Sequence, residues 1–196
     1  MADNYNTRQT LIDSVRDQNN DHAWEDFVAT YEPYIYAIIR RMGISPADSR
    51  DIHQDVLVQI WKHLPEYKCQ PDSRFRGWVS TITTNAVRSF IRSRSNKSKK
   101  LNTFEREQKV LEAGLSEIDA IAEKEWEVFL AETALENIKS SFSGRGIDVF
   151  LKTLDGQSVE QIAADLNIEE TSVYQLRARV KKSLSKEVGR LRAELD

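Results

Sequence analysis

The sequence predicts an all-α protein built from two small helical domains joined by a flexible acidic linker. Glycine and proline are scarce, at 7 and 4 of 196 residues, and long stretches carry no turn signal. Apolar residues recur at helical spacing in both halves. Charge also changes sign along the chain. Between Ser73 and Phe104 there is no acidic residue, whereas residues 105–139 hold ten acids and four bases. We therefore expect one domain at 1–100, a linker at 101–120 and a second domain with a helix-turn-helix at 121–196.

Composition excludes several classes of protein. With 40% hydrophobic and 30% charged residues, the chain can bury a core and stay in solution. Its net charge of −3 argues against a protein that binds nucleic acid over its whole surface. The single cysteine, Cys69, excludes an internal disulfide and a multi-cysteine zinc site. The first ten residues show no signal peptide, and no apolar run approaches the ~20 residues of a membrane span. We expect a cytoplasmic protein without a cofactor.

The N-terminal third reads as three helices. Thr7 to Val15 predicts a short leading helix, and a second begins at Asp21 as its N-cap. Pro33 lies within the continuing apolar pattern, so a break or kink is expected there. The segment S-P-A-D starting at Ser45 is a strong start for the third helix, with a serine cap, proline in first position and an acid in the first turn.

The third helix, residues 46–64, separates its apolar and polar positions. Its buried stripe is expected to be Ile52, Val56, Leu57, Ile60, Trp61 and Leu64, and its opposite side Asp51, Gln54, Asp55, Gln59 and Lys62. After a loop, a fourth helix is expected at 75–94. Its inward positions are predicted as Trp78, Val79, Ile82, Ala86 and Phe90, and its outer face as Thr81, Thr84, Asn85, Arg88, Ser89 and Arg92.

Basic residues gather on and after the fourth helix: Arg74, Arg76, Arg88, Arg92, Arg94, Lys97, Lys99 and Lys100. A stripe of one sign suits a phosphate backbone, because neutralising phosphates releases counterions. The alternative is an ordinary solvated face, although such faces usually mix charges of both signs. The pattern favours nucleic acid.

The second domain is predicted to end in a helix-turn-helix at residues 159–178. The motif requires a small residue where its helices touch, here Ala163, and a residue that tolerates left-handed backbone at the turn, here Asn167. Thr171 is a candidate cap for the second helix, which carries several bases. Apolar residues fall on the inner faces: Ile162, Leu166, Ile168, Val173 and Leu176. An ordinary helical hairpin shares part of this pattern, but the complete set favours DNA binding.

Three stretches together resemble bacterial RNA polymerase sigma factors of the sigma-70 family, of the compact extracytoplasmic-function (ECF) type. D-S-R-D-I-H-Q-D-V-L-V-Q-I-W at 48–61 is similar to the family's acidic D-x-x-Q-[DE] helix. F-R-G-W-V-S-T-I-T-T-N-A-V-R-S-F-I-R at 75–92 is similar to its F-x-x-W-L-x-x-I-A-x-N segment. D-G-Q-S-V-E-Q-I-A-A-D-L at 155–166 leads into the helix-turn-helix. The resemblance covers about residues 24–191 except the linker. Residues 82–85 depart from the usual I-A-x-N, which leaves base preference open.

The resemblance implies a division of labour and no enzymatic activity. The acidic helix would dock on core RNA polymerase through Asp51, Gln54 and Asp55. The basic helix would capture the opened minus-ten strand through Arg76, Trp78, Asn85, Arg88, Ser89 and Arg92. The helix-turn-helix would bind the minus-thirty-five duplex through Thr171, Ser172, Tyr174, Gln175, Arg177, Arg179 and Lys181. Trp78 also lies on the apolar stripe, which favours a core position. An anti-sigma protein as a further partner is compatible with the family.

Two other functions would account for part of the sequence. Asp48, Asp51, His53 and Asp55 cluster in sequence and suggest a metal enzyme, but on a helix His53 points about 160° away from Asp51 and Asp55, given ~100° per residue. No second group of ligands is evident. A helix-turn-helix repressor or activator acting without core polymerase would use the second domain. Such a regulator would not need the acidic helix or the amide-bearing basic helix of the first domain.

Overall fold

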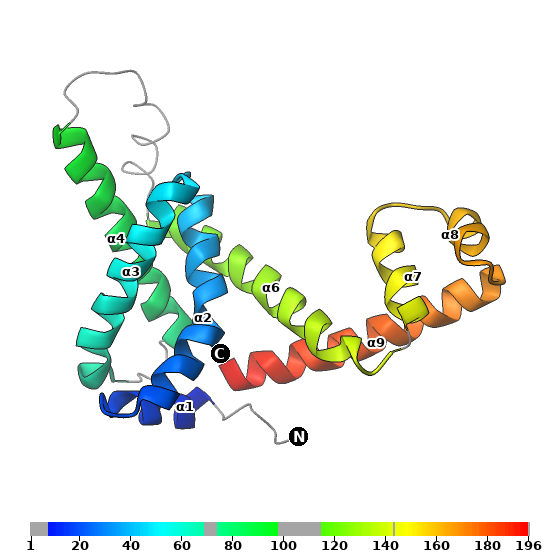
Figure 1. Ribbon diagram of the computed structural model, residues 1–196, viewed down its shortest axis with the longest axis horizontal. Coiled ribbons are helices and arrows are strands. Elements are labelled where there is room, and N and C mark those ends of the chain that lie inside the picture. Colours follow the sequence, from blue (N-terminus) through cyan, green and yellow to red (C-terminus); the bar gives the residue numbers. More distant parts are fainter. Residues whose placement is uncertain (1–7, 69–73, 98–114, 143, 196) are drawn as a thin grey trace. The chain divides into compact units, whose positions relative to one another are not determined.

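A computed structural model describes residues 8–68, 74–97, 115–142 and 144–195, and every regular element in these ranges is helical (Figure 1). The all-α prediction is confirmed. The predicted linker lies largely outside the described residues, and its last part, from Leu115, already belongs to a helix. The elements are α1 (Arg8–Arg16), α2 (Asp21–Arg41), α3 (Pro46–His63), η1 (Leu64–Glu66), α4 (Phe75–Lys97), α6 (Leu115–Lys139), α7 (Gly144–Leu154), α8 (Val159–Leu166) and α9 (Glu170–Leu195).

Contacts divide the chain into two units within α6, one comprising residues 1–129 and 194–196 and the other residues 130–193. The start of α6 packs with the first unit because Trp126 is fully buried against Tyr31 and Tyr34 of α2, with ring centroids 6.3 and 5.0 Å away. The domain boundaries expected at residues 100 and 121 stay a prediction. Within the structure, α6 as far as Phe129 contributes to the first core.

The second helix, α2, runs without a break through Pro33. The break expected there is wrong, and exposure explains why. Pro33 removes the donor to the carbonyl of Ala29, but both residues are exposed, so water can reach the unpaired group. The N-cap is Asn20 rather than Asp21, since the Asn20 side chain accepts a hydrogen bond from Ala23 N at 3.1 Å.

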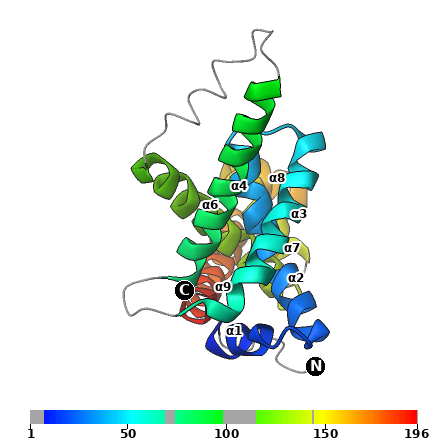
Figure 2. The same cartoon turned by 90° about the vertical axis from the view of Figure 1, so that its left-hand side faces the viewer.

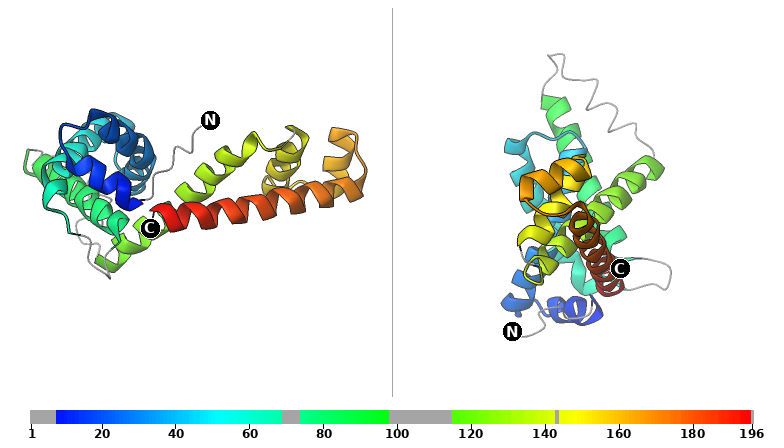
Figure 3. Two further views of the ribbon diagram at one scale, coloured as in Figure 1. Left: turned by 90° about the horizontal axis from the view of Figure 1, so that it is seen from below. Right: turned by 90° about the vertical axis from the view of Figure 1, so that its right-hand side faces the viewer.

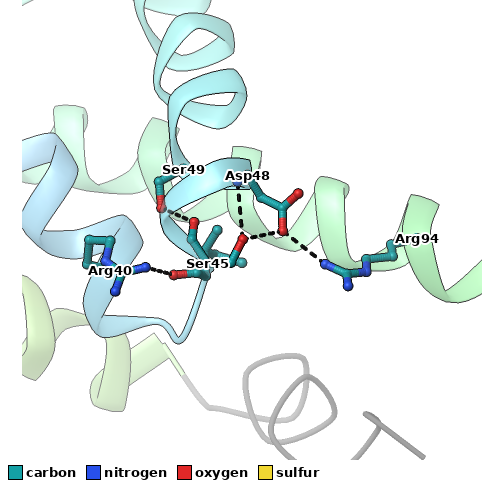
Figure 4. A network of polar contacts seen from close by, with 6 residues as sticks. Arg40, Ser45, Asp48, Ser49 and Arg94 are labelled. Atoms are coloured by element: carbon teal, nitrogen blue, oxygen red, sulfur yellow. Dashed lines mark hydrogen bonds and ion pairs between the residues drawn. The ribbon is translucent and has the colours of Figure 1, made fainter. Parts of the chain in front are cut away.

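The start of α3 follows the sequence prediction. Ser45 Oγ accepts a hydrogen bond from Asp48 N at 3.2 Å and donates one to the Asp48 carboxylate at 2.6 Å. Figure 4 shows that Arg94 of α4 reaches the same carboxylate, at 3.0 Å, while Ser49 and Arg40 bind the backbone before α3. The cap of α3 thus also ties the far end of α4 to the first turn of α3.

The buried stripe of α4 is rotated from the one predicted. The side chains buried most completely are spaced by four: Phe75, Val79, Thr83, Val87 and Ile91. Thr83 tolerates this burial because its hydroxyl donates to Val79 O at 2.8 Å. Of the predicted inward set, Trp78, Ile82, Ala86 and Phe90 are only half-buried, and Thr84, predicted on the outer face, is buried. The pattern of apolar residues could not reveal that Thr83 is buried, because its hydroxyl bonds to a carbonyl of its own helix.

The second unit has two small cores that share α7. One joins the end of α6 to α7 and α9, and the other joins α7 to α8 and the start of α9 (Figure 3). The five apolar side chains expected on the inner faces of the helix-turn-helix all lie in the second core. Its buried members are Val149, Ile162, Ala163 and Val173, with Val159, Leu166, Ile168 and Leu176 packed against them.

The turn between α8 and α9 has the predicted backbone. Asn167 has φ 50° and ψ 56°, the left-handed conformation, and its N–H donates to the last turn of α8. Ser158 begins α8 with a reciprocal capping box that includes Gln161. Thr171 is not a cap, because α9 already begins at Glu170.

In the described part of the chain, no helix combines the length and the apolar character that crossing a membrane requires.

Candidate functional site

The residues expected to bind core polymerase lie together on the exposed side of α3. Asp51, Gln54 and Asp55 are all exposed. Val58 lies on the same side with 44% of its surface exposed, an unusual position for an apolar β-branched residue at the centre of a helix. The exposed face of α3 is therefore an acidic and amide surface with one apolar side chain in it, a composition suited to contact with another protein.

A groove of about 640 Å³ runs between α3 and α4. The two helices lie side by side in both Figure 1 and Figure 2 and pack against each other. Ile82, Ala86 and Phe90, which the rotation of α4 leaves only half-buried, line the groove. Its polar lining is Asp55, Gln59 and His63 from α3 and Asn85, Ser89 and Ser93 from α4.

The groove brings together residues assigned to two different partners. Asp55 was predicted to bind polymerase, whereas Asn85 and Ser89 were predicted to bind the opened strand. Neither Asp55 nor Asn85 has a hydrogen-bond partner within the ranges that the structure describes. An amide with an unused donor and acceptor can pair with the edge of a base. The groove is thus lined by a carboxylate and an amide that have no hydrogen-bond partner among the described residues.

Two further residues predicted for the minus-ten strand lie along α4. Arg92 is exposed, and Arg88 is half-buried with interactions inside the chain. Trp78 packs against Tyr67 and Phe75, with ring centroids 4.8 and 5.4 Å away, and is half-buried. This is the core-like position that its place on the apolar stripe favoured, and only part of the indole is left for stacking on a base.

Arg76 does not join the other predicted strand-binding residues. It is only 4% exposed, and its two terminal nitrogens bind Glu123 of α6 at 2.6 and 3.2 Å. Its guanidinium carbon also lies 5.4 Å from the centre of the Trp126 ring. In this structure the Arg76 side chain is not presented to a ligand. The pairing joins residues 47 positions apart, and neither residue carries a local signal of it.

The residues predicted for the minus-thirty-five duplex occupy the first three turns of α9. Thr171, Gln175, Arg179 and Lys181 are exposed, and Ser172 and Arg177 are half-buried. Tyr174 is 51% exposed, and the Arg177 guanidinium lies 5.3 Å from the centre of its ring. Such an arrangement presents amide, hydroxyl and aromatic groups nearest the helix start, followed by cations, as a recognition helix in the major groove does.

His53 is built into the core of the first unit. Its ring packs on Tyr36 with centroids 4.8 Å apart, and its Nε2 lies 3.9 Å from a Glu32 carboxylate oxygen. Burial lowers the pKa of His53 below its ordinary value, and the charge of Glu32 opposes this only in part. His53 is thus a packing side chain, a role that the sequence did not predict, since His53 was absent from the expected buried stripe of this helix.

Comparison with known proteins identifies the first unit. Residues 27–97 match the Sigma-70 region 2 family model. The RNA polymerase sigma factor CnrH of Cupriavidus metallidurans is 32% identical over 75 residues, a match that spans 38% of this chain and 38% of CnrH. The solved structure of CnrH in complex with the cytosolic domain of CnrY covers 92% of this chain and 96% of that one, at 22% identity and a TM-score of 0.39.

The region 2 match includes α3, α4 and the whole groove between them. It also contains two of the three stretches on which the family resemblance rests. Residues 27–97 are therefore similar to region 2 of the sigma-70 family, and the curated relative matches the chain over about two fifths of its own length.

Proposed function

We propose that this chain is a sigma factor that binds core RNA polymerase and directs it to promoters. Members of this family initiate transcription and are not enzymes. The observation that carries the proposal is the α3–α4 groove, where the unpaired Asp55 carboxylate and Asn85 amide lie in one region 2 domain. Polymerase docking and strand capture then occur on adjoining surfaces of a single helical pair.

The exposed face of α3 is the proposed polymerase surface. Asp51 and Asp55 supply charge, Gln54 supplies hydrogen bonds, and Val58 supplies an apolar contact that excludes water from the interface. The acids attract a basic partner, and the absence of acids along α4 keeps that attraction local to α3.

The exposed face of α4 is the proposed strand surface. Asn85 and Ser89 would contact base edges, and the cations Arg88 and Arg92 would contact phosphates. The apolar lining of the groove, including Phe90, gives an unstacked base a surface to pack on. In the second unit, α9 would read the minus-thirty-five duplex with Thr171, Ser172, Tyr174 and Gln175, and would hold phosphates with Arg177, Arg179 and Lys181.

A binding experiment with core polymerase tests the proposal. The full chain should retain purified core enzyme on a column, and Asp55→Arg should abolish retention because it reverses the charge at the groove. Glu25→Arg is the matched control, since it reverses an exposed acid on α2 and should change nothing. If the chain binds duplex DNA but never retains core, it is a polymerase-independent regulator and the proposal is wrong. An anti-sigma partner stays a prediction from the family resemblance.

A further inference from the structure

Residues 122–126 of α6 cover Arg76, the one predicted strand-binding residue that the structure buries. Glu123 accepts hydrogen bonds from both terminal nitrogens of Arg76, and Trp126 lies beneath the same guanidinium. Tyr34 Oη donates to Ala122 O at 3.4 Å, and Glu125 lies 3.6 Å from Arg41. All these contacts belong to the first unit. Four separate interactions thus hold one turn and a half of α6 over α2 and α4.

Carboxylate and phosphate compete for the same face of an arginine. The guanidinium fork pairs with either anion through two parallel hydrogen bonds. With Glu123 in place, both terminal nitrogens are already used and only 4% of Arg76 is exposed, so a phosphate has no access. The exposed Glu123 carboxylate also places negative charge directly beside Arg76.

This segment of α6 is tightly packed, but one of its buried polar groups has no hydrogen-bond partner among the described residues. Trp126 is fully buried, yet its indole N–H has no acceptor among the described residues. A buried donor without a partner costs free energy that a permanent core would normally avoid. The Glu123 side chain is 55% exposed, so water reaches the carboxylate side of the ion pair, whereas the Arg76 side chain is only 5% exposed.

We propose that residues 122–129 of α6 are an internal competitor of the promoter strand. In the free chain Arg76 is bound by Glu123. A phosphate of the strand can bind Arg76 only when residues 122–129 detach from α2 and α4. The inference rests on the proposed strand-binding role of α4. It adds to that role a barrier within the chain, which suppresses contact with nucleic acid until a sufficiently favourable strand is offered.

Binding of a fluorescein-labelled, mixed-sequence 16-nucleotide single strand to the full-length chain tests this. Glu123→Gln should tighten binding several-fold and steepen the salt dependence by about 0.7, the value for one additional phosphate contact on a single strand. Asp119→Asn removes the same charge from an exposed position of α6 and should change neither quantity. Equal effects of the two variants, or weaker binding by Glu123→Gln, would overturn the proposal.

A reversal variant and hydrogen exchange complete the test. Arg76→Gln added to Glu123→Gln should cancel the gain, and a gain that survives would show that Arg76 is not the residue released. In the unmodified chain, saturating single strand should speed amide exchange in residues 122–129; unchanged exchange with the strand bound also overturns the proposal. Core retention and promoter-dependent transcription are independent of these outcomes, so failure of the competitor leaves the sigma function standing.

Discussion

At the scale of single residues, the role proposed for Asn85 separates strand capture from duplex binding. Asn85 lines the groove, and removing its amide would take away hydrogen bonds to an unpaired base without altering phosphate contacts. Asn85→Ala should therefore reduce promoter opening, read by permanganate reactivity, by about tenfold, the size expected for ~1–3 kcal/mol of base discrimination. Binding to closed duplex should be unchanged. Equal losses in both measurements would show that Asn85 does not read the strand.

His53 gives the fold a predictable pH dependence. Burial lowers its pKa in the folded chain below the ordinary 6.5, so the unfolded chain binds more protons as the pH falls through that value. The stability that neutral His53 allows is complete above pH 6.5 and is lost below it. Urea unfolding between pH 7.5 and 5.5 should show this loss, and His53→Phe should flatten it. The exposed His22 is the control: a slope abolished by His22→Gln instead would refute the assignment.

At the scale of elements, the turn between α8 and α9 depends on left-handed backbone at Asn167. Asn167→Ala should destabilise the protein by about 1 kcal/mol, since a Cβ atom strains this conformation and alanine lacks the polar side chain with which asparagine can bond the local backbone. Asn167→Gly should be tolerated. Thermal unfolding measures both. If alanine proves as stable as glycine, the turn does not require the left-handed conformation.

Sequence patterns predicted elements whose determinants are local. The Ser45 cap, the Asn167 turn and the inner faces of α8 and α9 were foreseen because each depends on residues within a few positions. The buried face of α4 was not foreseen correctly, since Thr83 is a polar residue whose buried hydroxyl donates to a carbonyl of the same helix. The Arg76–Glu123 pair was also missed, because it depends on where a distant helix packs. Asp55 and Asn85 were each identified from motifs, but only the structure places them in one groove.

At the scale of the whole molecule, we propose different steps for the two units. The region 2 domain would dock on polymerase and hold the opened strand, and the helix-turn-helix would fix the upstream duplex. A helix-turn-helix by itself binds duplex DNA and opens nothing. Promoter opening should therefore depend on residues of α3 and α4, and upstream affinity on residues at the start of α9.

Run-off transcription from genomic fragments with purified core polymerase measures the central claim most directly. Added to core, the chain should produce discrete transcripts from a subset of fragments, and core alone should not. Asp55→Arg should remove these transcripts, whereas Glu25→Arg should leave them. Discrete promoter-dependent transcripts would confirm that the chain is a sigma factor. If core and chain together give the same products as core alone, while the chain still binds duplex DNA, the chain is not a sigma factor.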